Sequence, residues 1–264
     1  MAVVIGKPTF NMNNSDPLFR YERQLWMKSI SLEGQKKIAQ TSVLVVGAGG
    51  LGSPILFYLA AAGIGKIGIM DDDQITSSNL NRQILYTTKD LGLKKSSTAK
   101  QRIQDLNPSI RVEDYSERLD QHNAQNIISK YSLLIDASDN YPTRYLINDT
   151  SVLLRIPLFF AAVSAWSGIF FARIPHRNQA CFRCCYPVPL PEAESQDEKH
   201  AGIIGATAGF LGSLLCTQII QYITQDTFAY EGKMLWVDLE KARFFTYPCT
   251  LKETCLCHSL EKAS

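Results

Sequence analysis

The feature that most constrains this chain is a glycine-rich turn between two apolar runs. The turn, Gly47-Ala48-Gly49-Gly50-Leu51-Gly52, follows a predicted strand at Ser42–Val46 and precedes a predicted helix at Ser53–Ala62. Glycines at this spacing allow backbone N–H groups and a helix N-terminus to approach a phosphate. The turn therefore favours a nucleotide-binding α/β fold. The alternative is a helix that simply packs close to a strand.

Polar residues follow two further predicted strands. Lys66–Met70 is followed by Asp71-Asp72-Asp73, and Ser132–Ile135 is followed by Asp136-Ala137-Ser138-Asp139-Asn140. Helices predicted between these strands give a β-α-β order, which is typical of a parallel sheet. Ligands of open parallel sheets bind at the carboxyl ends of the strands. We therefore expect the polar side chains to surround one ligand.

The remaining elements have different patterns. Residues 15–40 are predicted to be helical with a break at Gly34, and a helix is expected near Lys94–Leu106. A further helix is predicted to begin near Pro142 or Thr143, because proline is favoured in the first helical turn. The last third is predicted to contain an apolar, β-rich segment at 157–174 and a strand pair at 234–247.

Composition and charge exclude several classes of protein. Hydrophobic residues make up 45% and charged residues 20% of the chain, as in soluble globular proteins. The 27 Lys and Arg residues nearly balance the 25 Asp and Glu residues, so neither nucleic acid nor a membrane surface is an expected partner. The uncharged stretch Ala201–Gln225 is long enough to cross a bilayer. Its scattered Thr, Ser and Gln side chains favour a buried core helix instead.

The cysteines and the N-terminus predict a reducing, cytoplasmic location. The chain has 7 cysteines, an odd number, and they crowd together instead of spreading as a disulfide framework would. Residues 1–10 lack the basic and apolar regions of a secretory signal.

Cationic residues beyond the second strand separate two kinds of nucleotide site. The glycine turn and Asp71 fit either an NAD(P)-dependent oxidoreductase or an ATP site, because a carboxylate about 20 residues after such a turn can bind a ribose. Arg82 and Lys95 have no role in the oxidoreductase. A triphosphate, by contrast, needs arginine, lysine and Mg²⁺ to neutralise its charge. Asp139, after the later strand, is a candidate Mg²⁺ ligand.

A series of ordered motifs runs along the chain. These are Arg20-Tyr21-x-Arg23-Gln24, Gly47-x-Gly49-Gly50-Leu51-Gly52, Asp71-x-Asp73, Ser78-Asn79-Leu80-x-Arg82-Gln83, Gly92-x-x-Lys95, and Asp139-Asn140 with Arg144 and Asn148. Together they resemble the ThiF, MoeB and HesA family of ubiquitin-activating-like adenylyltransferases, from about Phe19 to Cys257. Within that family, the run 82–90 is most similar to ThiF, the thiamine-pathway member.

The resemblance implies the fold and its organisation. The expected fold is α/β, with a Rossmann-like, mostly parallel sheet that continues into an antiparallel part, and a C-terminal zinc knuckle. Residues 1–264 would form a single adenylation domain. It would comprise an N-terminal helical arm (15–40), an ATP-binding half (41–150) and a carrier-binding and zinc half (151–264). The resemblance also implies a homodimer with two ATP sites.

The implied reaction is adenylation of a small ubiquitin-like sulfur-carrier protein, similar to ThiS or MoaD. The enzyme would use ATP and Mg²⁺ to activate the carrier's C-terminal Gly-Gly carboxylate, for sulfur transfer in thiamine thiazole or molybdopterin synthesis. Two alternatives stay open at this point. One is a non-catalytic module that binds a ubiquitin-like protein, and the other is an enzyme that adenylates a peptide.

The matched motifs also imply roles for individual residues. Asp71 would bind the ribose, Asn79, Arg82 and Lys95 the phosphates, and Asp139 the Mg²⁺, while Arg23 would reach the phosphates from the neighbouring subunit. The expected catalytic residues are Arg23, Arg82, Lys95 and Asp139. The expected cofactor-binding residues are Gly47, Gly49, Gly50, Gly52, Asp71, Asp73, Asn79, Arg82, Gln83, Lys95, Asp139 and Asn140.

The cysteine pattern predicts a structural zinc site. Cys181 and Cys184 have the spacing of a zinc knuckle, and the family resemblance implies a second pair near the C-terminus. This chain departs from the family pattern there, because either Cys255 and Cys257 or Cys255 and His258 can complete the set. We take the two cysteines as ligands. Four protein ligands leave no open position for water, so the zinc would be structural.

A second departure concerns covalent chemistry. Relatives often have a cysteine shortly before the Ala201-Gly202 step, where it can bond to the activated carrier, but this chain has Glu198 at the matching place. We expect Cys185, the nearest spare thiol, to be a bystander of the zinc knuckle and Cys216 to be a core residue. The adenylate would then be released, or passed to a sulfur donor, without a thioester on this protein.

Overall fold

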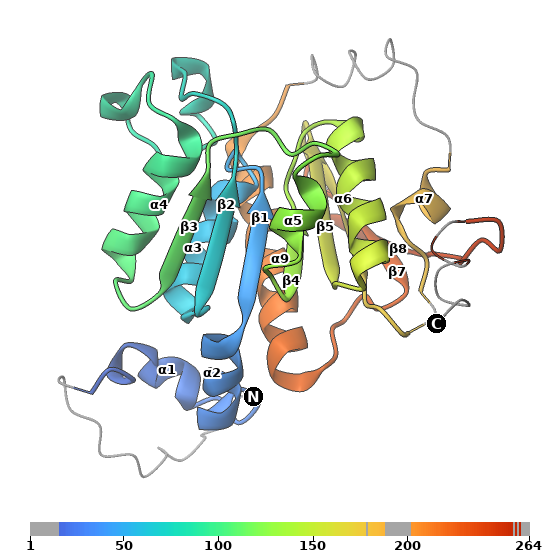
Figure 1. Ribbon diagram of the computed structural model, residues 1–264, viewed down its shortest axis with the longest axis horizontal. Helices are drawn as coiled ribbons and strands as arrows, with labels where there is room; N and C mark the ends of the chain where they lie inside the picture. The colour runs from blue at the N-terminus through green and yellow to red at the C-terminus, as the bar shows by residue number, and fades with distance from the viewer. Residues whose placement is uncertain (1–15, 178, 188–201, 256, 258, 260–264) are drawn as a thin grey trace.

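A single eight-stranded sheet organises the protein in the computed structural model, which describes residues 16–177, 179–187, 202–255, 257 and 259 (Figure 1). The strand order is β3-β2-β1-β4-β5-β6-β7-β8. Strands β3, β2, β1, β4 and β5 run parallel, and the remaining pairs are antiparallel. This arrangement confirms the predicted mostly parallel sheet with an antiparallel continuation.

The strands are β1 Ser42–Val46, β2 Lys66–Met70, β3 Arg111–Tyr115, β4 Leu133–Asp136, β5 Leu158–Ser164, β6 Ser167–Arg173, β7 Lys233–Asp238 and β8 Arg243–Pro248. The α-helices are α1 Glu22–Leu25, α2 Ser31–Gln40, α3 Gly52–Ala62, α4 Lys95–Leu106, α5 Ala124–Ile128, α6 Tyr141–Leu154, α7 Phe182–Cys185 and α9 Gly205–Gln225. Short 3₁₀ turns lie at η1 Phe19–Tyr21, η2 Ser77–Asn79 and η3 Thr88–Asp90.

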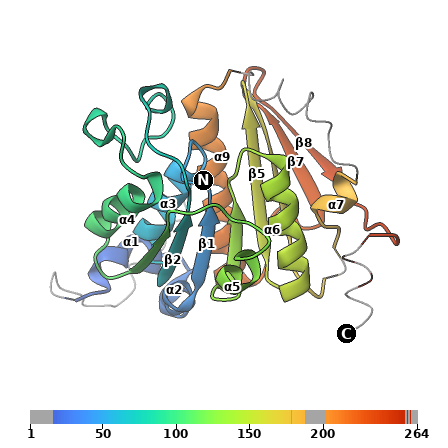
Figure 2. The ribbon, with the colours of Figure 1, turned by 45° about the horizontal axis from the view of Figure 1, so that its top comes forward.

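The parallel half of the sheet is buried on both faces. On one face, the apolar side chains of α3, α4 and α9 pack against the strands, and on the other face α5 and α6 cover them (Figure 2). Strands β1, β2 and β4 are accordingly almost continuous apolar runs, as expected for strands covered on two sides. By contrast, every residue of β8, at the edge of the antiparallel half, is exposed.

The apolar stretch near the C-terminus forms α9, a core helix. By length and composition alone α9 could cross a membrane. However, it packs against α2, α3, β5 and β6, and its apolar side chains, such as Leu211 and Leu215, belong to the main core. Gly212 permits the close contact with α3, because a Cβ there would lie 2.6 Å from Pro54 Cγ.

The N-terminal arm differs from the expected helix with a break at Gly34. The helical segments α1 and α2 are separated by a turn at residues 26–30, and Gly34 lies inside α2. The prediction of a break was wrong because this glycine serves packing. A Cβ on Gly34 would lie 3.1 Å from Thr224 Cγ2, at the contact between α2 and α9.

Gly68 offers a test of the close packing in β2. A Cβ at Gly68 would overlap the ring and hydroxyl of Tyr131, whose hydroxyl donates to Glu113 at 3.0 Å. Gly68→Ala is therefore expected to lower the free energy of unfolding by about 1–3 kcal/mol in urea denaturation. Gly209→Ala in α9 is the control, because nothing lies within 4 Å of its Cβ position. Equal stability of the two variants would contradict the assigned overlap.

Candidate functional site

The glycine turn lies where β1 and β4 end, in direct contact with the backbone that follows β4. Gly47 has φ +98°, and a Cβ on it would lie 2.6 Å from the carbonyl oxygen of Ala137. Any other residue would be both strained and too large at this position. Glycine at this position therefore allows the glycine turn to pack directly against the backbone that follows β4.

Asp71, the residue after β2, hydrogen bonds the glycine turn directly. Its Oδ2 accepts from the backbone N–H of Ala48 at 2.8 Å, and its Oδ1 accepts from that of Asp73 at 3.0 Å. Burial raises the pKa of Asp71, and the nearby positive charge of Lys95 opposes that increase. A carboxylate oxygen has more than one lone pair, so both oxygens can still accept hydrogen bonds from a ligand.

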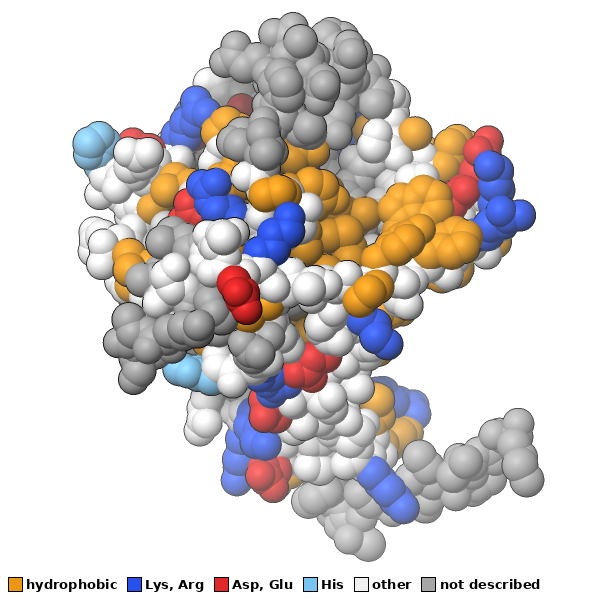
Figure 3. All heavy atoms as spheres, turned by 90° about the vertical axis from the view of Figure 1, so that its right-hand side faces the viewer, with side chains coloured by type: hydrophobic (Ala, Val, Ile, Leu, Met, Phe, Trp, Pro, Cys, Tyr) orange, Lys and Arg blue, Asp and Glu red, His pale blue; other side chains and the backbone are white. Residues whose placement is uncertain are grey.

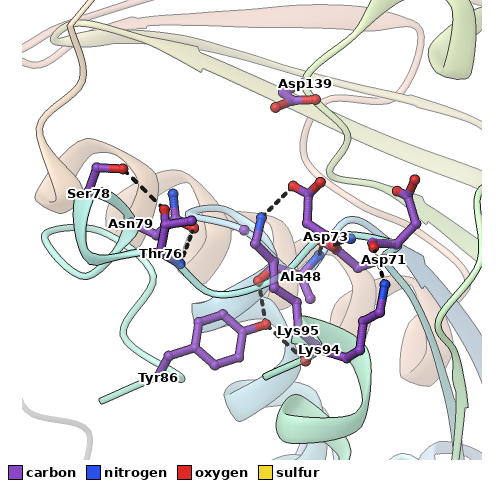
Figure 4. Close-up of polar contacts among 12 residues, drawn as sticks. Ala48, Asp71, Asp73, Thr76, Ser78, Asn79, Tyr86, Lys94, Lys95 and Asp139 are labelled. Carbon is purple, nitrogen blue, oxygen red and sulfur yellow. Dashed lines mark hydrogen bonds and ion pairs between the residues drawn. The ribbon is translucent and has the colours of Figure 1, made fainter. Parts of the chain in front are cut away.

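Lys95 and Asp73, both predicted site residues, form an ion pair beside the turn. Lys95 Nζ lies 2.7 Å from Asp73 Oδ2, and the lysine side chain is only 7% exposed (Figure 4). The backbone N–H of Lys95 also donates to the carbonyl oxygen of Asp73 at 3.0 Å. An ammonium group has three donors, so one hydrogen bond to Asp73 leaves two for a ligand.

The predicted phosphate-binding segment 79–83 packs over the glycine turn. A Cβ on Gly50 would lie 3.4 Å from Arg82 Cγ, and one on Gly49 would lie 3.5 Å from Gln83 Nε2. Arg82 donates to the carbonyl oxygen of Ser78 at 2.9 Å, and the Asn79 side chain accepts from the N–H of Thr76 at 3.3 Å. These local bonds determine the shape of the segment.

Gln83 carries an unsatisfied buried group next to the turn. Its side chain is 4% exposed, and its Oε1 has no partner among the described residues. An unpaired buried polar atom is costly, so such an atom commonly indicates a missing ligand or water. Together with the glycine turn and the adjacent cations, this atom fits a bound nucleotide.

Asp139 lies on the turn that follows β4. The side chain is exposed, and its Oδ1 accepts from Asn140 Nδ2 at 3.5 Å. Figure 4 draws Asp139 apart from the other site carboxylates. The carboxylates within 4.8 Å of one another are those of residues 71, 72 and 73. The structure thus brings Asp139 to the same end of the sheet, but not into that acidic group.

Arg23 is the predicted site residue that the structure separates from the others. It belongs to α1, which lies at the end of the sheet where β1 begins, opposite the end where the glycine turn follows β1 (Figure 1). Its guanidinium lies 4.1 Å from the centre of the Trp26 ring. Within one subunit, Arg23 therefore lies apart from the glycine turn and the residues around it.

Tyr86 belongs to the site but was not predicted. Its hydroxyl lies 2.8 Å from the carbonyl oxygen of Ala48 and 3.2 Å from that of Lys95, so it joins the glycine turn to the start of α4. Burial raises the pKa of Tyr86, which keeps the hydroxyl protonated as a donor. An aromatic residue in a loop gives little signal of such a role in a single sequence.

The four predicted zinc ligands lie together. The sulfur atoms of Cys181, Cys184, Cys255 and Cys257 are all within 4.8 Å of one another. The distances are 4.0 Å for Cys181–Cys184, 3.6 Å for Cys181–Cys255 and 3.5 Å for Cys184–Cys257. Tetrahedral zinc with Zn–S bonds of about 2.3 Å separates its sulfur ligands by about 3.8 Å. The donor set and its spacing therefore fit a zinc ion.

The other cysteines lie outside this group. Cys216 is 2% exposed in α9 and donates to the carbonyl oxygen of Ile55 at 3.6 Å, so it is a core residue as predicted. Cys185 packs against a buried aromatic cluster, which consists of Tyr145, Phe160, Phe171 and Phe182. His258 and Glu198, which mark the two departures from the family pattern, lie outside the described residues.

Comparison with known proteins identifies the family to which this chain belongs. A model of the ThiF family matches residues 21–258. The chain is 41% identical over 233 residues to the sulfur carrier protein adenylyltransferase of Thermus thermophilus, covering 87% of this chain and 86% of that protein. The chain belongs to the ThiF family, which confirms the predicted family.

Two further comparisons, with one sequence relative and one solved structure, cover a smaller share of the matched protein. The chain is 39% identical to adenylyltransferase and sulfurtransferase MOCS3-1 of Zea mays, over 87% of this chain but 49% of that protein, so it spans about half the length of such relatives. The crystal structure of E. coli MccB with ATP superposes with a TM-score of 0.81 at 19% identity, covering 93% of this chain and 75% of that one. At this identity the likeness shows the shared fold alone.

The cysteine cluster generates a test of metal content. We expect purified protein to contain about one zinc ion per chain by elemental mass spectrometry. Cys257→Ser should lower the zinc content and the melting temperature, because its sulfur lies 3.5 Å from that of Cys184. His258→Ala should change neither. Loss of zinc from His258→Ala but not from Cys257→Ser would show that His258, and not Cys257, is the fourth ligand.

Proposed function

We propose that this chain is an ATP-dependent adenylyltransferase that activates the C-terminal Gly-Gly carboxylate of a small ubiquitin-like sulfur carrier. The observation that carries the proposal is the joining of the glycine turn to Asp71 and Lys95, with Arg82 packed over it. The relatives named as adenylyltransferases support the same reaction. Thiamine and molybdopterin carriers both fit this proposal.

In this reaction a carboxylate oxygen of the carrier bonds to the α-phosphorus of ATP, and the oxygen between the α- and β-phosphorus atoms leaves with pyrophosphate. Both reactants are anions, so the barrier falls when cations compensate their charge. No protein nucleophile and no proton transfer are required. Positioning and electrostatic stabilisation therefore supply the catalysis.

The residues around the glycine turn would have separate roles in this reaction. Asp71 would accept hydrogen bonds from the ribose hydroxyls, while Asn79, Arg82 and the two remaining donors of Lys95 would bind phosphate oxygens. The backbone N–H groups of the glycine turn would lie against the phosphates. Mg²⁺, with Asp139 as its proposed ligand, would supply further positive charge for the leaving pyrophosphate.

The exposed aromatic surface around β8 provides a docking surface for the carrier. It comprises Trp166, Phe210, Phe244, Phe245 and Tyr247, which are 39% to 54% exposed. Phe244 packs with Phe210 of α9 on one face of β8, with ring centres 5.8 Å apart, whereas Phe245 and Tyr247 point to the opposite face. Hydrophobic side chains gather on the side of the molecule where β7 and β8 lie (Figure 3). Exposed apolar patches of this kind are typical of partner sites. The edge strand β8 also offers unpaired backbone groups to a partner.

ATP–pyrophosphate exchange tests the proposal directly. With Mg²⁺ and a panel of carriers ending in Gly-Gly, we expect exchange with one carrier and none with the same carrier lacking its last glycine. Lys95→Ala should reduce exchange by about 100-fold or more, because a positioned cation is lost. Exchange with no carrier, despite ATP binding, would favour the binding-module or peptide alternatives.

A mixing experiment tests a homodimer in which Arg23 completes the partner's site. Arg23 lies at the far end of its own subunit from the glycine turn, so its proposed phosphate contact requires a second copy. Mixing Arg23→Ala with Asp139→Ala protein should restore about a quarter of wild-type activity, since about half the dimers are mixed and each has one intact site. Each variant mixed with itself is the control. Inactivity of verified mixed dimers would remove this role.

A further inference from the structure

A buried carboxylate accepts hydrogen bonds from the turn that carries Asp139. Asp136, the last residue of β4, is 1% exposed. Its Oδ1 accepts from the backbone N–H of Ser138 at 3.0 Å and from the Ser138 hydroxyl at 2.6 Å. A buried carboxylate is costly unless it is hydrogen bonded or paired with a positive charge. Both bonds here stabilise the residue directly before Asp139.

A buried arginine contacts the same turn from α6. Arg144 is 8% exposed, and one of its terminal nitrogens donates to the carbonyl oxygen of Ser138 at 3.1 Å. Its guanidinium lies 5.1 Å and 5.2 Å from the ring centres of Tyr141 and Phe160, within the range of cation–π attraction. Burial raises the pKa of Asp136, and the charge of Arg144 opposes that increase.

The residues on either side of Asp139 are also constrained. The backbone of Ser138, directly before Asp139, packs against Gly47. A Cβ on Gly47 would lie 3.2 Å from the Ser138 nitrogen. After it, the Asn140 side chain accepts from the N–H of Thr143 at 3.0 Å and begins α6. Asp139 itself is exposed. An exposed carboxylate thus projects from a turn whose neighbouring residues are all bonded or packed.

We propose that Arg144 and Asp136 are positioning residues, which bind Ser138 from two sides so that the Asp139 carboxylate is held ready for a divalent cation. The inference rests on the proposed function, in which Asp139 binds the cation that accompanies ATP. Neither residue touches the cation or the nucleotide. Their loss lets the turn move and separates Asp139 from the rest of the site.

Mn²⁺ binding in the presence of a non-hydrolysable ATP analogue provides a readout that does not depend on turnover. Titration of the full chain by electron paramagnetic resonance should show that Asp139→Ala and Arg144→Met each weaken Mn²⁺ binding by about 10–100-fold. In the Asp139→Ala background, Arg144→Met should add less than about twofold, because both changes act on one ligand. Arg144→Lys serves as the second variant if Arg144→Met does not fold.

Arg183→Met is the matched control. Arg183 also packs over an aromatic side chain of α6, with its guanidinium 4.5 Å from the Tyr145 ring centre, and it forms a bidentate ion pair with Asp149. Its substitution should lower stability but leave Mn²⁺ binding within about twofold of wild type. Hydrogen exchange at residues 137–140 should accelerate in Arg144→Met and stay unchanged in this control.

The outcomes separate the inference from the proposed function. Mn²⁺ binding that weakens in Asp139→Ala but not in Arg144→Met overturns the positioning role alone. Full additivity of the two substitutions also overturns it. Unchanged binding in Asp139→Ala overturns the metal role of Asp139 and the inference with it. Wild-type protein that binds Mn²⁺ but gives no pyrophosphate exchange with any carrier overturns the proposed function alone.

Discussion

The close approach of Gly47 to the backbone after β4 is the contact on which the rest of the site depends. It requires a residue with positive φ and no Cβ, because the carbonyl oxygen of Ala137 occupies the position of a side chain. The contact joins the glycine turn to the turn that carries Asp139. The glycine turn, whose backbone is proposed to bind phosphate, is thereby packed against the turn of a candidate metal ligand, so movement of either turn would disturb the other.

Charged groups around these two turns interact with one another and with the backbone. The ammonium group of Lys95 binds Asp73 at 2.7 Å, and both oxygens of Asp71 accept backbone hydrogen bonds. An ammonium group has three donors and a carboxylate oxygen has more than one lone pair, so this internal pairing leaves further donors and lone pairs for a ligand.

The elements that could be predicted from the sequence are those specified by residues close together in the chain. Strands β1 and β2 begin and end where expected, because short β-branched runs and turn residues specify them. The predictions failed where contacts between residues far apart in the sequence determine the structure. Gly34 predicts a helix break from the sequence, but its contact with Thr224 on α9 determines its role. Strand β3 was not predicted because its charged residues lie at a sheet edge. The contact between Tyr86 and the glycine turn likewise exists only in the folded chain.

The two halves of the sheet are stabilised by different means, and this difference bears on function. The parallel half is covered on both faces, whereas β8 exposes both of its faces and contributes little to the core. The four cysteines lie together, two in or next to α7 and two in the segment after β8, so a metal bound by all four would close a loop that contains α9, β7 and β8. A metal bound there would stabilise this half through the entropy of loop closure and through ligand bonds. With a metal bound there, the aromatic surface around β8 could stay exposed for the proposed carrier while the strands remain folded.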